Sequence, residues 1–280
     1  MFRFHLTDDT RLEVDSPTGL FEFSDMTMID KEHPFLSRIQ GDDVSAYLER
    51  YAKVHELDCR IRLKTKVVKV WRTGAGWTVR TQSDEELYCD KLIVSTGLAS
   101  QARLPAIPNI DDGFSGPVLH TYALGKEHHR LTDPAVKTVV VIGGSKSAIE
   151  TVCLCIDAGK FVHWIIRPDG GGASMMIVTD KDNPRIIALN ATRLFNVFAP
   201  SIFAATGFWY KLLHSRRSRL GNRVENLYWR RASKVVHSGP KYEKSTNGDK
   251  VRPILESVFW NLNCISLIDK NSRFLDYLHN

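Results

Sequence analysis

Residues 137–150 hold the feature that most constrains how this chain can fold. An apolar run opened by Thr138 and ending at Ile142 has the composition of a buried parallel strand. Gly143 and Gly144 end the run, and residues 147–156 continue with helical character. A strand, a tight glycine turn and a helix in this order present backbone N–H groups to a pyrophosphate. The segment therefore predicts a dinucleotide site and, through it, redox chemistry.

The turn fits the G-x-G-x-x-G/A pattern in most of its positions. Gly143 makes the tight turn, and Ala148 is the third small residue, which lets helix and strand pack closely. Ser145 replaces the second glycine, whose usual role is to let the backbone approach the phosphates. A second strand is expected at residues 161–166, which completes a βαβ unit. An ordinary βαβ turn that binds no ligand is the alternative.

The end of the second strand indicates which nucleotide the unit prefers. An NAD site would place a carboxylate there, whereas this chain has Arg167, which suits the 2′-phosphate of NADP. Asp169 lies two residues further on and could still hold a ribose hydroxyl. We therefore expect NADP(H) in preference to NAD(H).

Composition is that of an ordinary globular protein with room for one large or two modest domains. The chain has 280 residues, of which 43% are hydrophobic and 25% charged, and its net charge is +6. Basic residues are dispersed except at 214–219 and 229–231, so a solvated face is favoured and no nucleic-acid partner is expected. Five cysteines without regular spacing favour a reducing compartment, the cytoplasm, and we expect Cys153 and Cys155 to pack in the core.

One apolar stretch, residues 194–210, is about as long as a short membrane span. Asn196, Pro200 and Gly207 interrupt it, which favours a buried or substrate-facing helical hairpin. The basic cluster that follows leaves contact of residues 194–219 with a membrane surface as an alternative, and a true span as a second.

Periodicity predicts the remaining elements. Apolar residues recur at helical spacing after Asp42, and Gly74 and Gly76 mark a hairpin turn between two alternating segments. The expected strands cover residues 59–71, 77–81 and 87–97; residues 180–235 are expected to be helical, 238–249 a polar loop, and 255–267 a short closing segment.

Three motifs, in order, resemble the flavin-dependent monooxygenases of the flavin-containing and Baeyer–Villiger type. The first is a strand and Thr-Gly turn at residues 93–97, followed by the proline-rich segment 104–108. The second, residues 114–124, matches F-x-G-x-x-x-H through Phe114, Gly116 and His120. The third is the glycine turn at 143–148. Together the motifs span residues 93–148, and a weaker similarity extends back to about residue 20.

The resemblance implies an α/β fold in which a Rossmann-like NADP-binding domain is joined to an incomplete FAD-binding domain. Residues 1–110 would form the partial FAD-binding domain, 111–236 the inserted NADP-binding domain with a helical extension, and 237–280 the start of a return to the FAD domain. Such enzymes carry a second glycine turn for FAD, and none precedes Gly97. The chain thus resembles a truncated member of the family.

The implied activity is FAD- and NADPH-dependent insertion of one oxygen atom from O₂ into a small lipophilic substrate, such as a secondary metabolite. Two alternatives remain open: an inactive NADP-binding remnant or interaction protein, and a simple NADP dehydrogenase. The aromatic residues of 195–210 would line the path of the substrate.

The resemblance also implies roles for particular residues. Arg167 would take the 2′-phosphate, and His120 would couple the domains or place the nicotinamide. Thr96 and Gly97 would lie near the exit of the flavin domain, Gln40 would face FAD, and the Val67 backbone would contact its adenine end. No metal is expected, since His128 and His129 lack partners at ligand spacing and are interpreted as surface residues. The pyrophosphate would rest on Gly143, Gly144, Ser145, Lys146, Ser147 and Ala148.

Overall fold

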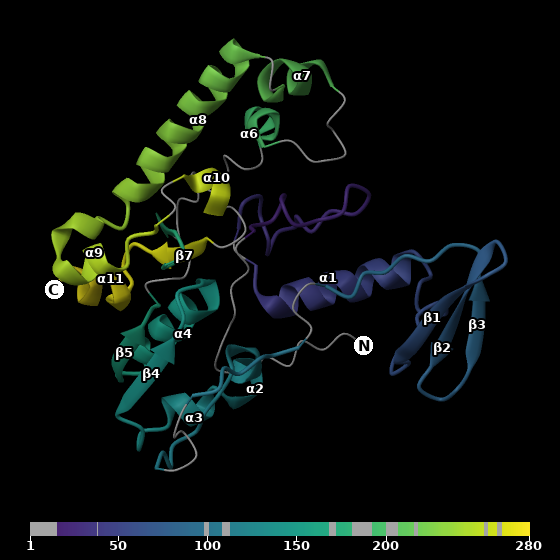
Figure 1. Cartoon of the computed structure of the whole chain (residues 1–280), viewed down its shortest axis with the longest axis horizontal. Coiled ribbons are helices and arrows are strands. Elements are labelled where there is room, and N and C mark those ends of the chain that lie inside the picture. The colour runs from purple at the N-terminus through teal and green to yellow at the C-terminus, as the bar shows by residue number, and fades with distance from the viewer. Residues whose placement is uncertain are drawn as a thin grey trace. The chain divides into compact units, whose positions relative to one another are not determined.

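The protein is a mixed α/β structure, which confirms the predicted fold class at that level (Figure 1). The computed structural model describes residues 16–37, 39–97, 101–107, 113–167, 172–180, 192–199, 207–215, 218–254, 257–261 and 265–280. One compact unit contains the described residues between 41 and 115, and a second contains those between 16 and 40 and between 116 and 280. Assignment of a cofactor to each part of the chain stays a prediction.

The first unit begins with the predicted helix. α1 (Gly41–Val54) has Asp42 and Asp43 in its first turn, where carboxylates favour the positive end of the helix dipole. An antiparallel three-stranded sheet follows, made of β1 (Val67–Thr73), β2 (Gly76–Thr81) and β3 (Glu86–Cys89). The predicted hairpin is confirmed, since β1 pairs with β2 and Gly74 has a φ of +59° between them.

Two of the predicted strands are too long. β1 begins at Val67 rather than at residue 59, because the preceding residues form turns. β3 ends at Cys89 rather than at Gly97, because its register on β2 runs only from Glu86 to Cys89. Beyond that point Ile93 and Val94 are 88% and 70% exposed. An apolar run without a pairing strand among the described residues therefore forms no ladder and lies outside regular structure.

The second unit contains the predicted βαβ motif. β4 (Thr138–Ile142) and β5 (Phe161–Ile165) are parallel, paired in register from Thr138↔Phe161 to Ile142↔Ile165, and α4 (Lys146–Asp157) connects them. Burial alternates along β4: Val139 and Val141 are buried, whereas Val140 and Ile142 are each 53% exposed. The run predicted to be buried is thus covered on one face only, the face against which α4 packs.

The main core of this unit lies between α4 and the C-terminal elements. α4 buries Ala148, Ile149, Val152, Cys155 and Ile156. Against them pack β6 (Met176–Thr179), its parallel partner β7 (Ser266–Asp269), and α11 (Arg273–His279), which contributes Phe274, Leu275 and Leu278. The expected packing of Cys153 and Cys155 is confirmed, since Cys155 is fully buried and Cys153 lies against the same cluster.

The other regular elements among the described residues are helices. Short turns near the second motif are η1 (Thr121–Ala123), α2 (Leu124–Glu127) and α3 (His129–Thr132). Further along are α6 (Arg193–Phe198), α7 (Phe208–His214), α8 (Arg219–Ser238) and α10 (Val258–Asn261). A second core joins α6, α7 and α8, where the Phe198 ring stacks on Tyr228 at 4.0 Å and faces away from solvent. One of the aromatic residues expected along a substrate path thus belongs to this core, and the path itself stays a prediction.

The predicted polar loop at 238–249 contains two short helices, η4 (Tyr242–Lys244) and α9 (Thr246–Lys250). The Ser245 hydroxyl accepts a hydrogen bond from the Gly248 N–H at 2.9 Å and so caps α9. Lys241 enters η4 with a left-handed φ of +51°. Polar composition alone therefore misassigned a capped helical segment as a loop.

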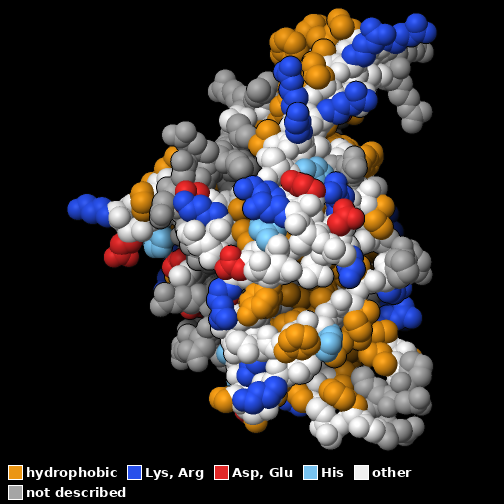
Figure 2. All heavy atoms as spheres, turned by 90° about the vertical axis from the view of Figure 1, so that its left-hand side faces the viewer, with side chains coloured by type: hydrophobic (Ala, Val, Ile, Leu, Met, Phe, Trp, Pro, Cys, Tyr) orange, Lys and Arg blue, Asp and Glu red, His pale blue; other side chains and the backbone are white. Residues whose placement is uncertain are grey.

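No helix in the described part of the chain is long and apolar enough to cross a membrane. Residues 200–206 of the apolar stretch lie outside the described residues. At its end, Phe208 and Trp209 on α7 are 71% and 60% exposed. Figure 2 shows hydrophobic and basic side chains gathered at the upper end of the molecule, where α7 and the start of α8 lie. Contact with a membrane surface stays a prediction.

Burial also predicts how the thiols react. Burial, reinforced by the nearby carboxylate of Asp157, raises the pKa of the Cys153 thiol to about 12, and burial raises that of Cys155 to about 11. At pH 8 a pKa of about 11 leaves only about a thousandth of the Cys155 thiol as the reactive thiolate. Cys59, by contrast, is exposed. We expect maleimide to label Cys59 at least about 100-fold faster than Cys155 at pH 8, as measured by peptide mass spectrometry. Equal rates in the folded protein would contradict this packing; in denaturant the rates should converge.

Candidate functional site

The glycine turn is fixed to the end of β5 by two hydrogen bonds. The Gly143 N–H donates to the Ile165 carbonyl oxygen at 2.9 Å, which extends the parallel ladder by one residue. The Trp164 Nε1–H donates to the Gly143 carbonyl oxygen at 2.7 Å. Gly143 itself has a φ of +130°, a conformation that residues with a Cβ rarely adopt. The tight turn predicted at this glycine is therefore present and anchored.

Ser145 stands where many dinucleotide sites have a second glycine, and its backbone shows why serine is tolerated. Its φ is −78°, so the position needs no glycine for conformational reasons. Ser145 is the N-cap of α4, yet its side chain accepts no capping hydrogen bond. The hydroxyl is exposed beside the N-terminus of a twelve-residue helix. It is thus placed to bind a group outside the helix.

Ala148, the predicted third small residue, is buried near the start of α4, and its role in helix–strand packing stays a prediction. It is 4% exposed. A Cβ built on Gly143 would lie 3.7 Å from the Ala148 Cβ, an ordinary van der Waals contact. The Ala148 side chain thus lies next to the glycine turn without crowding it.

Gly144 has a role that the sequence did not reveal. A Cβ at this position would lie 2.2 Å from the carbonyl oxygen of Gly172, and the Ser174 N–H donates to the Gly144 carbonyl oxygen at 2.6 Å. Residues 172–174, the crossing segment, therefore lie directly over the turn. Glycine is needed here for the approach of the protein's own backbone, whatever else the turn binds.

The cations of the site lie at the same sheet edge. β4 and β5 are parallel neighbours, so the glycine turn and Arg167, two residues beyond β5, emerge together. Arg167 is exposed, and none of the described carboxylates pairs with it. Lys146 opens α4 and lies 3.6 Å from Glu150, an exposed pair, while Ser147 is exposed beside it. The structure thus brings the predicted pyrophosphate residues and Arg167 to one edge.

His120 caps the first helical turn after the second motif. Its Nδ1 accepts a hydrogen bond from the Tyr122 N–H at 3.1 Å, which leaves Nε2 as the protonated nitrogen of the neutral ring. This capping role was missed by sequence reasoning, because histidine is not among the residues that usually cap helices. A role of His120 in domain coupling or nicotinamide placement stays a prediction.

The residues expected near the flavin lie elsewhere in the chain. Val67 opens β1, is 50% exposed and pairs with Thr81. Thr96 and Gly97 are exposed outside regular structure, and Gly97 has a φ of +74°. Gln40 is partly exposed just before α1. Their contacts with FAD stay predictions.

One interpretation about histidine is wrong. His128 was expected at the surface with His129, but it is 6% exposed. It follows α2 directly, and its carbonyl accepts hydrogen bonds from the Leu131 and Thr132 N–H groups at 2.9 and 3.1 Å. Within the described ranges no group of histidine, cysteine and carboxylate side chains could hold a metal ion.

The close approach of Gly172 predicts that a side chain at Gly144 destabilises the fold. In Gly144→Ala the new Cβ would meet backbone atoms of Gly172, so we expect the free energy of unfolding to fall by about 1–3 kcal/mol. Gly113→Ala is the matched control, because nothing lies within 4 Å of its Cβ position. Urea denaturation measures both; equal stability of the two variants would show that the segment does not cross the turn in solution.

Comparison with known proteins assigns the chain to a family. The family model of pyridine nucleotide-disulphide oxidoreductases matches residues 1–188. An FAD-dependent monooxygenase of Aspergillus sclerotiorum is 38% identical over 256 residues, which cover 87% of this chain and 44% of that protein. Another, of Pyrenophora dematioidea, is 36% identical over 259 residues, which cover 87% of this chain and 47% of that protein. The chain thus spans less than half the length of these two relatives.

A solved flavin-containing monooxygenase from Stenotrophomonas maltophilia is 21% identical with a TM-score of 0.44, over 57% of this chain and 45% of that one. The resemblance to flavin-dependent monooxygenases that the motifs indicated is confirmed by the two sequence relatives. Since the family model covers residues 1–188 of 280, this chain belongs to the pyridine nucleotide-disulphide oxidoreductase family.

Proposed function

We propose that this chain binds NADPH at the turn between β4 and α4 and serves an FAD-dependent monooxygenase reaction on a small lipophilic substrate. The observation that supports this most directly is the anchored turn at Gly143, with Arg167 at the same sheet edge. The two relatives named above are FAD-dependent monooxygenases, which supports the reaction class. Family membership makes the chemistry that of an oxidoreductase.

The residues at the turn fit a dinucleotide. The negative charge of a pyrophosphate is suited by the N-terminus of the twelve-residue helix α4. It is also suited by the exposed Ser145 and Ser147 hydroxyls and by the nearby Lys146 ammonium. When bound, NADPH would supply a hydride and FAD the flavin that reacts with O₂. The protein's part is to hold the pyrophosphate at α4 and to fix the first turn through the Trp164 and Ile165 contacts.

Preference for NADPH over NADH rests on Arg167. A guanidinium presents several N–H donors to a phosphate, and the 2′-phosphate is the only group that distinguishes the two nucleotides. No described carboxylate neutralises Arg167. Asp169, the residue that would favour a ribose hydroxyl, lies outside the described residues.

The low reactivity of the thiols on α4 favours the monooxygenase reaction over disulphide exchange. The family name includes disulphide oxidoreductases, and Cys153 and Cys155 are spaced closely on α4. Burial raises their pKa values to about 12 and about 11, so the thiolate that attacks a disulphide is disfavoured at neutral pH. Nucleotide chemistry at the turn is therefore better supported than thiol chemistry on this helix.

Replacing Arg167 tests the cofactor preference. In Arg167→Ala we expect the NADPH dissociation constant to rise about 10- to 100-fold, because a charge-assisted phosphate contact contributes about 1.5–3 kcal/mol. The NADH dissociation constant should change less than about twofold. Nucleotide fluorescence titration measures both, with Lys137→Ala as control, since Lys137 lies at the opposite end of β4. Equal weakening of both nucleotides would remove Arg167 from the 2′-phosphate site.

A spectrum of the purified chain distinguishes the monooxygenase proposal from the alternative of an NADP-binding remnant or interaction protein. We expect a stoichiometric flavin absorbance band after incubation with FAD, and loss of that band when NADPH is added without oxygen. A chain that binds NADPH but retains no flavin after gel filtration would support the remnant instead. Failure to bind either nucleotide would contradict both.

A further inference from the structure

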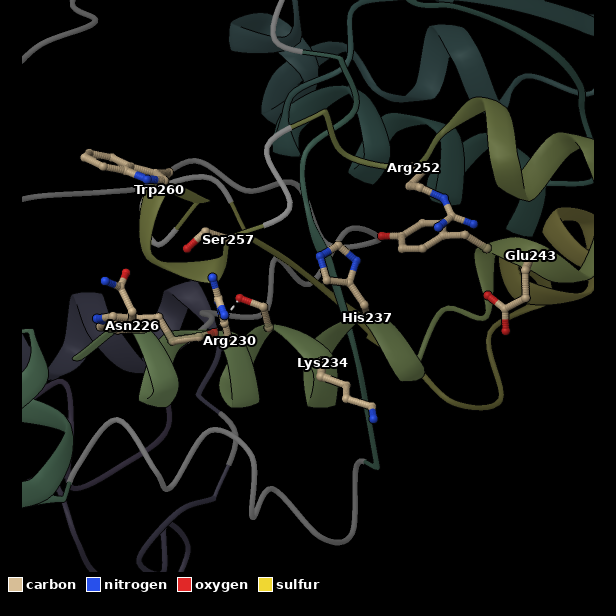
Figure 3. Close-up of a pocket in the computed structure, with 11 residues that line it drawn as sticks. Asn226, Arg230, Lys234, His237, Glu243, Arg252, Ser257 and Trp260 are labelled. Carbon is tan, nitrogen blue, oxygen red and sulfur yellow. Dashed lines mark hydrogen bonds between the residues drawn. The ribbon is translucent and has the colours of Figure 1, made fainter. Parts of the chain in front are cut away.

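A groove of about 560 Å³ lies between α8 and the segments that carry η4 and α10 (Figure 3). Its volume falls in the range of small-molecule sites, about 300–1,000 Å³. All of its lining residues belong to the second unit, so one compact part of the chain forms it. None of the residues of the glycine turn lines it.

One face of α8 makes a continuous wall. Its lining residues recur every three or four positions, which places them on one side of the helix: Asn226, Trp229, Arg230, Ser233, Lys234 and His237. The Ser233 hydroxyl donates to the Trp229 carbonyl oxygen at 2.7 Å and accepts from the Val258 N–H at 2.9 Å. That second bond holds α10 against α8, so the opposite wall is fixed at a defined distance.

Cations outnumber anions around the groove. Arg230, Lys234 and Arg252 line it, against the single carboxylate of Glu243. Arg252 is partly neutralised by Asp249 at 3.3 Å, whereas Arg230 and Lys234 form no ion pair with a described carboxylate. Figure 3 shows the Arg230 guanidinium directed from α8 toward Ser257, while the Lys234 ammonium points the other way. Arg230 is therefore the cation best placed to meet a bound anion.

An exposed indole completes the groove. Trp260 on α10 lines it and is 71% exposed. Its ring meets Phe259 edge-on at 4.9 Å, and Phe259 meets the buried Trp229 at 5.1 Å, so the exposed ring is supported by the core. A supported, exposed indole offers a face on which a flat apolar ring can stack. Charge and aromatic surface thus occur together.

We propose that this groove binds a small organic anion with a flat aromatic body, such as an aromatic carboxylate, with Arg230 meeting the charge and Trp260 the ring. The site is distinct from the nucleotide turn, since no residue of the turn lines it. Gly172, which crosses Gly144, also lies against Ile254, since a Cβ on Gly172 would be 2.9 Å from an Ile254 side-chain carbon. Arg252 lines the groove, and Ile254 follows it by two residues. The proposal does not depend on which nucleotide the turn binds.

Calorimetric titration of the full chain with 2-naphthoate and with the neutral 2-naphthamide tests the proposal. We expect one naphthoate per chain, bound at least about tenfold more tightly than the amide, because the pocket selects the charge. Arg230→Gln should weaken naphthoate about tenfold and leave the amide unchanged. Arg231→Gln is the matched control, since it removes the same charge from the neighbouring position of α8 but not from the groove lining.

Trp260→Leu supplies an independent readout. It should weaken the binding of both probes several-fold and reduce the quenching of tryptophan fluorescence that bound naphthoate causes. Three outcomes would overturn the proposal. They are equal binding of naphthoate and naphthamide, identical behaviour of the two arginine variants, and displacement of naphthoate by saturating NADPH. The last would make the probe a reporter of the nucleotide turn. Thermal unfolding of each variant checks that it folds, and Arg230 is exposed, so its replacement should leave the unfolding temperature unchanged.

Discussion

The hydrogen bond from the Gly143 N–H to the Ile165 carbonyl oxygen determines where the candidate site lies. It carries the β4–β5 ladder one residue into the turn, so the N-terminus of α4 starts at the edge where Arg167 emerges. The Trp164 indole N–H fixes the Gly143 carbonyl from the other side. Each bond contributes only about 1 kcal/mol. Their effect is mainly geometric, because together they hold a glycine at a φ that no other residue adopts readily.

The second glycine connects this turn with the rest of its unit through backbone packing. Gly144 admits Gly172, and Gly172 in turn admits Ile254, near the wall of the groove on α8. Close-packed contacts transmit displacement because little empty space absorbs it. A side chain at Gly144 would therefore have to displace Gly172, and one at Gly172 would have to displace Ile254. This arrangement explains why two small residues in a row are needed at the turn, although the nucleotide pattern itself calls for only one of them.

Local patterns were predictable from the sequence, and features that depend on distant partners were not. The strand, turn and helix at residues 138–157 follow from apolar composition, paired glycines and helical periodicity within twenty residues. Residues 90–97 have equally good strand composition, but a strand requires a partner, and β2 ends its pairing at Cys89. One local feature was also missed: Ser245 caps α9 and Lys241 is left-handed before η4, where polar composition indicated a loop. The groove was invisible, because α8 and Trp260 meet only in the folded chain.

The placement of charged residues, like the groove, depends on the folded chain and not on composition. A net charge of +6 spread over the chain favours no particular partner. Position decides instead: Arg252 is partly balanced by Asp249, and Lys146 by Glu150, whereas Arg167 and Arg230 have no described carboxylate to neutralise them. α4 shows the converse for its thiols, since its N-terminus faces the turn while Cys155 is buried in the core. In the proposed function the N-terminus of this helix binds the nucleotide, while its cysteines are buried away from reaction. The nucleotide, rather than a thiol, is therefore the better candidate to carry electrons.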